Sequence, residues 1–160
     1  ATRSGDNATM SGTNFSSWFN QTEGTFVAEW ISSDSVSSVI FLASDGTANN
    51  QIRFRNSSGG VTDYAILVGG TAVVALTPAN MSTPGVNHIM AGAYAVNDAA
   101  VVGDGQTVLT DNTVTLPALT QLTIGCVYGG LGEQLNGKLK RLTYFNRRLS
   151  NSQLSQLGSL

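Results

Sequence analysis

The feature that most constrains the fold is a succession of short runs of apolar or alternating residues, each closed by turn-forming residues. The run "GTFVAEWIS" at 24–32 alternates large apolar side chains with smaller or polar ones, which is typical of a half-buried β-strand. The run "VSSVIFLAS" at 36–44 leads directly into Asp45-Gly46, a dipeptide that favours a tight turn. Both runs therefore predict strands that end in turns.

The same pattern continues through the rest of the chain. "QIRFRN" at 51–56 and "TDYAILVGG" at 62–70 flank a Ser/Gly turn and predict part of a meander. "AAVVG" and "TVLTD" lie on either side of a Gly-Asp-Gly-Gln turn and predict a hairpin. In all, roughly ten to twelve short strands predict an all-β fold, an antiparallel β-sandwich or barrel.

Composition agrees with a folded β protein and excludes some partners. The 160 residues suit one domain, and the apolar share of 41% is enough for a core. Only 11% of the residues are charged, and Ser, Thr, Asn and Gly supply the remaining polarity. The formal net charge of −2 gives no field that would attract a polyanion, so we expect no nucleic-acid partner. No apolar run reaches the length of a membrane span, so we expect no membrane insertion.

The first residues resemble a connection from something upstream. The chain begins at Ala1 without a methionine or a signal peptide, and "ATRSGDNATMSGTNFSS" is typical of a linker. We therefore interpret residues 1–23 as a linker or entry segment and residues 24–160 as a single β-sandwich domain. We expect the chain to be part of a longer protein.

The last 22 residues, "NGKLKRLTYFNRRLSNSQLSQL", combine an alternating run with one short helix. Ser150 is a good helix N-cap, and Leu149, Leu154 and Leu157 would form its apolar stripe. Five basic residues also fall in this stretch: Lys138, Lys140, Arg141, Arg147 and Arg148. They could bind an anionic partner. Lysines on an edge strand more often prevent that strand from pairing with another chain, and we favour this interpretation.

This closing segment resembles that of laminin-G-like domains, in the concanavalin A-like lectin/glucanase superfamily. The shared pattern is a glycine, an alternating strand, Asn-Arg-x-Leu-Ser and a short helix. Gly137, Tyr144, Asn146, Arg147 and Leu149 are among the residues that fill it. The resemblance implies a jelly-roll sandwich over about residues 24–157 with a short C-terminal helix. It is weakly specific for function, because proteins that share this fold have many different functions.

A second resemblance lies near the beginning of the chain. "NFSSWFNQTEGTF" is similar to the entry into sandwich domains of bacteriophage tail and virion proteins. Low charge, one cysteine and the abundance of Asn, Ser, Thr and Gly fit that setting. The resemblance implies a virion location, at the surface or in the tail, and an extracellular site of action.

Candidate catalytic residues are few. Glycan hydrolysis needs two carboxylates across the scissile bond, and the superfamily's glucanases carry them as Glu-x-Asp-x-x-Glu. The three glutamates, Glu23, Glu29 and Glu133, fall in no such pattern. Cys126 is more readily a buried small side chain than a nucleophile paired with His88, the only histidine. We therefore predict no enzyme.

Metal binding has equally little support. A single cysteine and a single histidine exclude the usual zinc clusters. Asp45, Asn49 and Asn50 could contribute to a calcium site, as laminin-G-like domains sometimes have, but without a glutamate or the EF-hand spacing. We predict no metal and no cofactor, and leave calcium as an alternative.

Carbohydrate binding requires an aromatic platform and polar groups for hydroxyls. The loop "VYGGLGEQLNG" supplies Tyr128, Glu133, Gln134 and Asn136 within a short stretch. The central meander adds Arg53, Arg55 and Tyr64, with Asp63 beside them. For any one residue, a polar sheet face or an edge aromatic is the simpler interpretation, but as a set they are our candidate carbohydrate site.

The leading hypothesis is a non-catalytic module of a phage tail or virion surface protein that binds host cell-surface carbohydrate. Its partner would be a cell-surface glycan or a neighbouring virion protein. The first alternative is a structural, decorating or oligomerising virion domain without a ligand, for which a homo-oligomer such as a trimer is expected. The second is a glycan-cleaving enzyme, which the glutamates disfavour.

Overall fold

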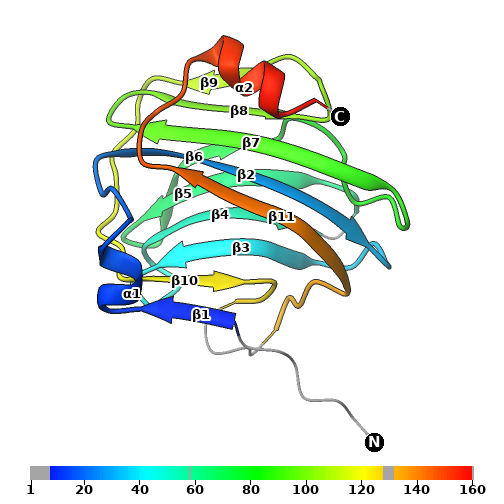
Figure 1. Ribbon diagram of the computed structural model, residues 1–160, viewed down its shortest axis with the longest axis horizontal. Helices are drawn as coiled ribbons and strands as arrows, with labels where there is room; N and C mark the ends of the chain where they lie inside the picture. The colour runs from blue at the N-terminus through cyan, green and yellow to red at the C-terminus, as the bar shows by residue number, and fades with distance from the viewer. Residues whose placement is uncertain (1–7, 58, 128–131, 160) are drawn as a thin grey trace, which may run out of the picture.

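Two antiparallel β-sheets face each other in the computed structural model (Figure 1), which describes residues 8–57, 59–127 and 132–159. Sheet A runs in the order β1 (Ala8–Ser11), β10 (Gln121–Ile124), β3 (Ser38–Ser44), β4 (Gln51–Asn56), β5 (Thr62–Val68) and β6 (Thr71–Leu76). Sheet B runs in the order β11 (Gly137–Phe145), β2 (Glu23–Ser32), β7 (Asn87–Ala95), β8 (Ala99–Gly103) and β9 (Leu109–Asp111). The predicted meander is β3–β4–β5, which β6 extends, and the predicted hairpin is β8–β9.

The main core lies between the two sheets. It consists largely of the inward side chains of both, including Phe26, Trp30, Phe41, Phe54 and Tyr64, all at most 1% exposed. The glycine of "AGAYAV" allows this close approach, because a Cβ on Gly92 would lie 2.8 Å from the Phe54 ring. Gly92 of β7 therefore serves the close packing of the two sheets.

A second, smaller core covers the outer face of sheet B. Helix α2 (Asn151–Leu157) lies over β7 and β8 (Figure 1), and its Leu154 is fully buried in a cluster that also contains Val27 and Ile89. Both faces of β2 are consequently buried over much of its length, with Thr25 at 0% and Val27 at 1% exposure, although the alternation predicted one buried face. Alternation shows which residues share a face but not what covers that face.

Helix α2 begins where the sequence predicted. The Ser150 side chain accepts a hydrogen bond from the Gln153 amide, and the Gln153 side chain accepts one from the Ser150 amide. This reciprocal capping box satisfies two amides that the first helical turn would otherwise leave unpaired. The capping and the apolar stripe predicted for residues 149–157 are confirmed.

The described part of the entry segment packs into the sandwich. Strand β1 pairs with β10 along Ala8–Ser11, and α1 (Thr13–Ser16) places Phe15 at 0% exposure in the main core. Phe19 is also buried there. Residues 8–23, which we interpreted as a linker or entry segment, therefore contribute a strand and two core rings.

Among the described residues, no helix is both long enough and apolar enough to cross a bilayer.

Candidate functional site

Two arginines and an aspartate lie together on the outer face of sheet A. Alternation along β4 turns Ile52 and Phe54 into the core and leaves Arg53 and Arg55 outside. The register of β4 and β5 places Asp63 directly opposite Arg55. Arg55 donates from Nε and Nη2 to Asp63 Oδ2 at 3.3 and 3.1 Å, a fork that fixes both side chains.

Glu133 joins this group from the loop that precedes β11. Its Oε1 lies 3.6 Å from Arg55 Nη1, and its backbone carbonyl accepts a hydrogen bond from the Val39 amide at 2.7 Å. The backbone of Glu133 has φ of 46°, a left-handed conformation that is uncommon for a residue with a Cβ. We call Arg53, Arg55, Asp63 and Glu133 the charged cluster.

The charged cluster is half-buried and its charges are largely paired. Burial lowers the pKa of Arg53, and the neighbouring Arg55 charge acts in the same direction, while Asp63 and Glu133 oppose it. Arg53 Nη1 donates to Gln51 Oε1 at 2.8 Å, whereas its Nε faces Asp63 Oδ1 at 3.7 Å. Those last two atoms are buried without a hydrogen-bond partner, so the Arg53–Asp63 contact is looser than the Arg55–Asp63 fork.

The structure brings only some of the predicted site residues together. Arg53, Arg55 and Glu133 form the charged cluster with Asp63. Gln134 is exposed, and Asn136 donates from Nδ2 to Asp34 Oδ2 at 2.8 Å, in the connection between β2 and β3. Asn136 thus contacts a neighbouring loop, without a described contact to the cluster.

Tyr64 does not belong to this surface. Its side chain is fully buried in the core, and its hydroxyl donates to the Ala93 carbonyl at 3.0 Å, across the two sheets. The cause is strand parity, because Tyr64 follows Asp63 on β5 and must point to the opposite face. Tyr128 lies outside the described residues.

Gln51, which was not among the predicted site residues, is a partner of Arg53. Gln51 is 4% exposed and lies two residues before Arg53 on the same face of β4. The signal was available, because residues i and i+2 of a strand share a face. The contact of Arg55 with Glu133 had no comparable signal, since the loop reaches the sheet only in the folded chain.

The other candidate chemical groups have structural partners. The Asp45 carboxylate accepts hydrogen bonds from the Thr47 amide and hydroxyl and from Asn50 Nδ2, and these lower its pKa. Both carboxylate oxygens of Asp45, which was the acidic residue of the alternative calcium site, thus accept hydrogen bonds within the turn. Within the described residues, no group of three His, Cys, Asp or Glu side chains is placed to hold a metal.

The two residues considered for nucleophilic chemistry also contact other groups. Cys126 is buried, and its Sγ lies 3.8 Å from the Ile124 carbonyl. His88 is 3% exposed, and its Nδ1 lies 2.7 Å from Asp104 Oδ2. Each side chain therefore has a structural role.

Several basic residues near the end of the chain bind acidic groups of the sandwich. Strand β11 is an edge strand of sheet B, as its lysines suggested. Lys140 Nζ lies 2.6 Å from Glu29 Oε1, which lowers the Glu29 pKa. Arg148 donates to Asp98 Oδ1 at 2.7 Å. These contacts agree with a structural rather than a polyanion-binding role for this segment.

The architecture defines a class of fold, the jelly-roll β-sandwich, and comparisons with known proteins support that assignment. No protein-family model matches the sequence, and no curated protein sequence matches it either. Solved structures do match. The CBM40 of Ruminococcus gnavus IT-sialidase, bound to alpha2,3 sialyllactose, is 12% identical with a TM-score of 0.71, over 88% of this chain and 84% of that one.

Two other similar structures come from different settings. A SAP-like pentraxin from Limulus polyphemus is 18% identical with a TM-score of 0.64, over 86% of this chain and 70% of that one. The NanB sialidase from Streptococcus pneumoniae is 14% identical with a TM-score of 0.71, over 98% of this chain but only 27% of that one. At these identities the likeness establishes the fold, and it confirms the predicted jelly-roll sandwich with a short C-terminal helix.

Proposed function

We propose that this chain is a non-catalytic carbohydrate-binding module and that the charged cluster is part of its binding site. The observation that carries the proposal is the meeting of two guanidinium and two carboxylate groups, from β4, β5 and a loop, on one sheet face. Guanidinium donors and carboxylate acceptors are the groups that hold sugar hydroxyls and sugar carboxylates. The Arg55 and Glu133 side chains are 26% and 34% exposed, so a ligand can reach them.

An acidic sugar suits this site best. Arg55 Nη1 lies 3.6 Å from Glu133, beyond hydrogen-bond distance, so its N–H groups remain available to donate to a ligand carboxylate. The fold is shared with a CBM40 solved with alpha2,3 sialyllactose, a glycan that carries a carboxylate. Glu133 would then accept hydrogen bonds from ligand hydroxyls.

Calorimetric titration with alpha2,3 sialyllactose, beside lactose, tests the proposal. We expect saturable binding of the sialylated sugar, weakened about tenfold by Arg55→Ala because a charge-assisted hydrogen bond is lost. Lys138→Ala is the matched control, since Lys138 is an exposed cation on β11, in the other sheet. No binding to sialyllactose, and a flat response across an array of acidic and neutral surface glycans, would overturn the carbohydrate proposal.

The non-catalytic part of the proposal has its own test. Each glutamate is engaged in a structural contact: Glu23 with the Arg148 amide, Glu29 with Lys140, and Glu133 with Arg55. We therefore expect no release of reducing sugar from sialylated or neutral polysaccharides. Reproducible turnover by the purified chain would contradict this part and revive the enzyme alternative.

We further propose that the module belongs to a virion surface or phage tail and acts outside the cell. The support is the sequence resemblance of "NFSSWFNQTEGTF" and the low charge of the chain. Sequencing the coding region upstream of Ala1 tests it, because a coiled coil or β-helix there would indicate a tail fibre or spike. Mass measurement in solution adds a second readout. A trimer without glycan binding would favour the decorating alternative.

A further inference from the structure

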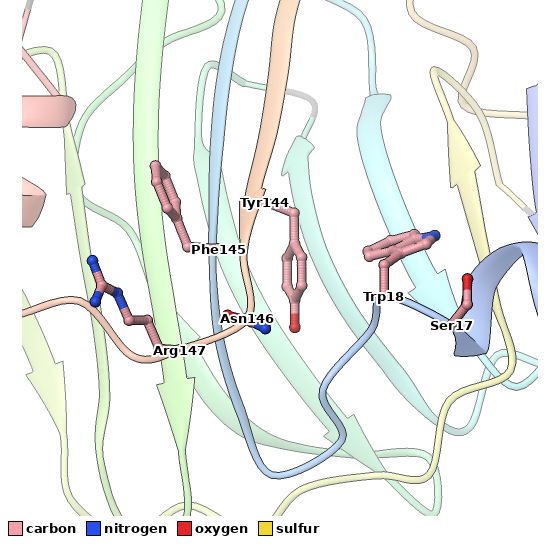
Figure 2. A pocket seen from close by; sticks show the side chains of 6 residues that line it. All are labelled: Ser17, Trp18, Tyr144, Phe145, Asn146 and Arg147. Atoms are coloured by element: carbon pink, nitrogen blue, oxygen red, sulfur yellow. The ribbon is translucent and has the colours of Figure 1, made fainter.

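An open pocket lies where α1 approaches the end of β11, away from the charged cluster. It is lined by Ser17, Trp18 and residues 144–147, and its volume is about 600 Å³, within the range of small-ligand sites. In Figure 2, Trp18 and Tyr144 lie on one side of β11 with Asn146 beside the hydroxyl end of Tyr144, while Phe145 and Arg147 extend on the other side. We call this the aromatic pocket.

The Trp18 indole offers a face with no ring stacked on it. Three aromatic neighbours, Phe15, Phe19 and Tyr144, meet it at interplanar angles of 75°, 86° and 68°, all edge-on. The indole is half-buried, and its Nε1 donates to the Asn14 carbonyl at 2.6 Å, which fixes the orientation of the ring. Within the described residues, this half-buried indole therefore has a fixed orientation and no ring stacked face to face on it.

The Tyr144 ring is equally well fixed. Its hydroxyl accepts a hydrogen bond from the Asn20 amide at 3.0 Å and lies 3.0 Å from the Tyr94 hydroxyl, which itself donates to the Asn20 carbonyl. Gly24 permits this arrangement, because a Cβ there would lie 2.5 Å from the Tyr94 hydroxyl and 2.7 Å from that of Tyr144. Two rigid aromatic walls reduce the ordering cost of binding.

The polar groups at the rim remain available to a ligand. The Asn146 carbonyl accepts from Asn20 Nδ2 at 2.9 Å, which anchors the backbone there. The side chains of Ser17 and Asn146 are exposed, and neither makes a hydrogen bond to another described residue. Arg147 is the one charged residue among the six that line the pocket, and in Figure 2 it extends on the other side of β11 from the two rings. Among the lining residues, the groups on the side of the two rings are neutral, so this part of the pocket suits a neutral polar ligand.

We propose that the aromatic pocket is a second binding site, which takes a neutral pyranose ring of a glycan. The apolar C–H face of the sugar would lie on the Trp18 indole, with Tyr144 as the side wall. The sugar hydroxyls would bond to the Ser17 hydroxyl and the Asn146 amide, groups that can both donate and accept. The site uses none of the residues of the charged cluster, so it can exist whether or not that cluster binds an acidic sugar.

Intrinsic fluorescence gives a selective readout. The chain has two tryptophans, and Trp30 is 0% exposed, so a soluble sugar changes the emission through Trp18. The probes are cellotriose, maltotriose and N-acetyllactosamine, each titrated to about 20 mM, where millimolar affinities are still measurable. We expect a saturable blue shift with at least one of them.

Two variants and two controls complete the test, with affinities also measured by saturation-transfer NMR. We expect Asn146→Ala to weaken binding about fivefold, because one direct hydrogen bond is lost, and Trp18→Phe to weaken it at least as much. Lys138→Ala and Arg55→Ala should leave neutral-sugar binding unchanged, while Arg55→Ala alone weakens sialyllactose binding. Asn146 is exposed, so its variant remains informative even if Trp18→Phe is unstable.

Either of two results would overturn the proposal. The first is the absence of a saturable signal with all three neutral probes. The second is binding that Asn146→Ala and Trp18→Phe both leave unchanged. Failure of sialyllactose to bind would count against the proposed function of the charged cluster alone.

Discussion

The charged cluster and the aromatic pocket both combine rigid side chains with polar groups that a ligand can reach. They differ in the interactions that make the side chains rigid. In the charged cluster, Arg55 and Asp63 hold each other in place through their charged groups, so only part of these groups, such as Arg55 Nη1, is left for a ligand. In the aromatic pocket, backbone groups of Asn14 and Asn20 hold the rings, and the side chains of Ser17 and Asn146 stay available.

The difference follows from the energetics of half-buried groups. Two neighbouring guanidinium groups on a sheet face need carboxylates, because a charge that loses water without a partner costs several kcal/mol. An aromatic ring needs only packing and one hydrogen bond for its polar tip. We therefore expect stability to depend most on charge pairing in the cluster, whereas the pocket is more tolerant of change.

The largest effect should come from removing the acid of the charged cluster. Asp63→Ala leaves Arg53 and Arg55 facing each other without the carboxylate between them, so we expect the free energy of unfolding to fall by about 2–3 kcal/mol. Chemical denaturation measures it. Asp63→Asn keeps the shape and part of the hydrogen bonding, and should cost less. An Asp63→Ala variant as stable as the parent would mean that the cluster does not need its acid.

A smaller effect is expected from the hydroxyl of the aromatic pocket. Tyr144→Phe keeps the ring but leaves the Asn20 amide without an acceptor, so unfolding should become easier by about 1 kcal/mol. Neutral-sugar binding should persist, because the ring wall is retained. Thermal unfolding and the fluorescence titration measure the two quantities on one sample. Loss of binding with stability unchanged would show that the hydroxyl contacts the ligand directly.

The smallest effect, and the most direct contrast between the two regions, concerns salt. Raising NaCl from about 50 to about 500 mM screens partly exposed charges, so sialyllactose should bind the charged cluster roughly threefold more weakly. Neutral-sugar binding in the aromatic pocket should change by less than about 1.5-fold, because it involves no ion pair. Calorimetry at the two salt concentrations compares them. Equal salt dependence of the two sugars would contradict the assignment of separate sites.

Much of the fold was predictable because it is encoded locally. Alternating or apolar runs identified β2, β3, β4 and β5, and the dipeptide Asp45-Gly46 marked the end of β3. The capping residue Ser150 and the leucines after it located α2. Strand β1 was missed, because "ATMS" is too short and too polar to show a period, and only its pairing with β10 makes it a strand.

The candidate sites were less predictable, because each depends on contacts between segments distant in sequence. Strand alternation correctly predicted that Arg53 and Arg55 share the outer face of β4. Tyr64 was placed on the wrong face of β5, because it follows Asp63 and is buried in the core. Trp18, which we assigned to an entry segment, becomes part of a candidate site only because it lies beside Tyr144 of the last strand. No local pattern indicates such a contact.

By itself, the sequence determined the class of structure, the positions of most strands and the cap of the final helix. Each of these follows from backbone and side-chain preferences that act within a few residues. Only the tertiary structure decided that Glu133 reaches Arg55, that α2 packs on β7 and β8 and that Trp18 meets Tyr144. Those contacts arise when two sheets and their loops close around one core, where burial of apolar surface outweighs local preference.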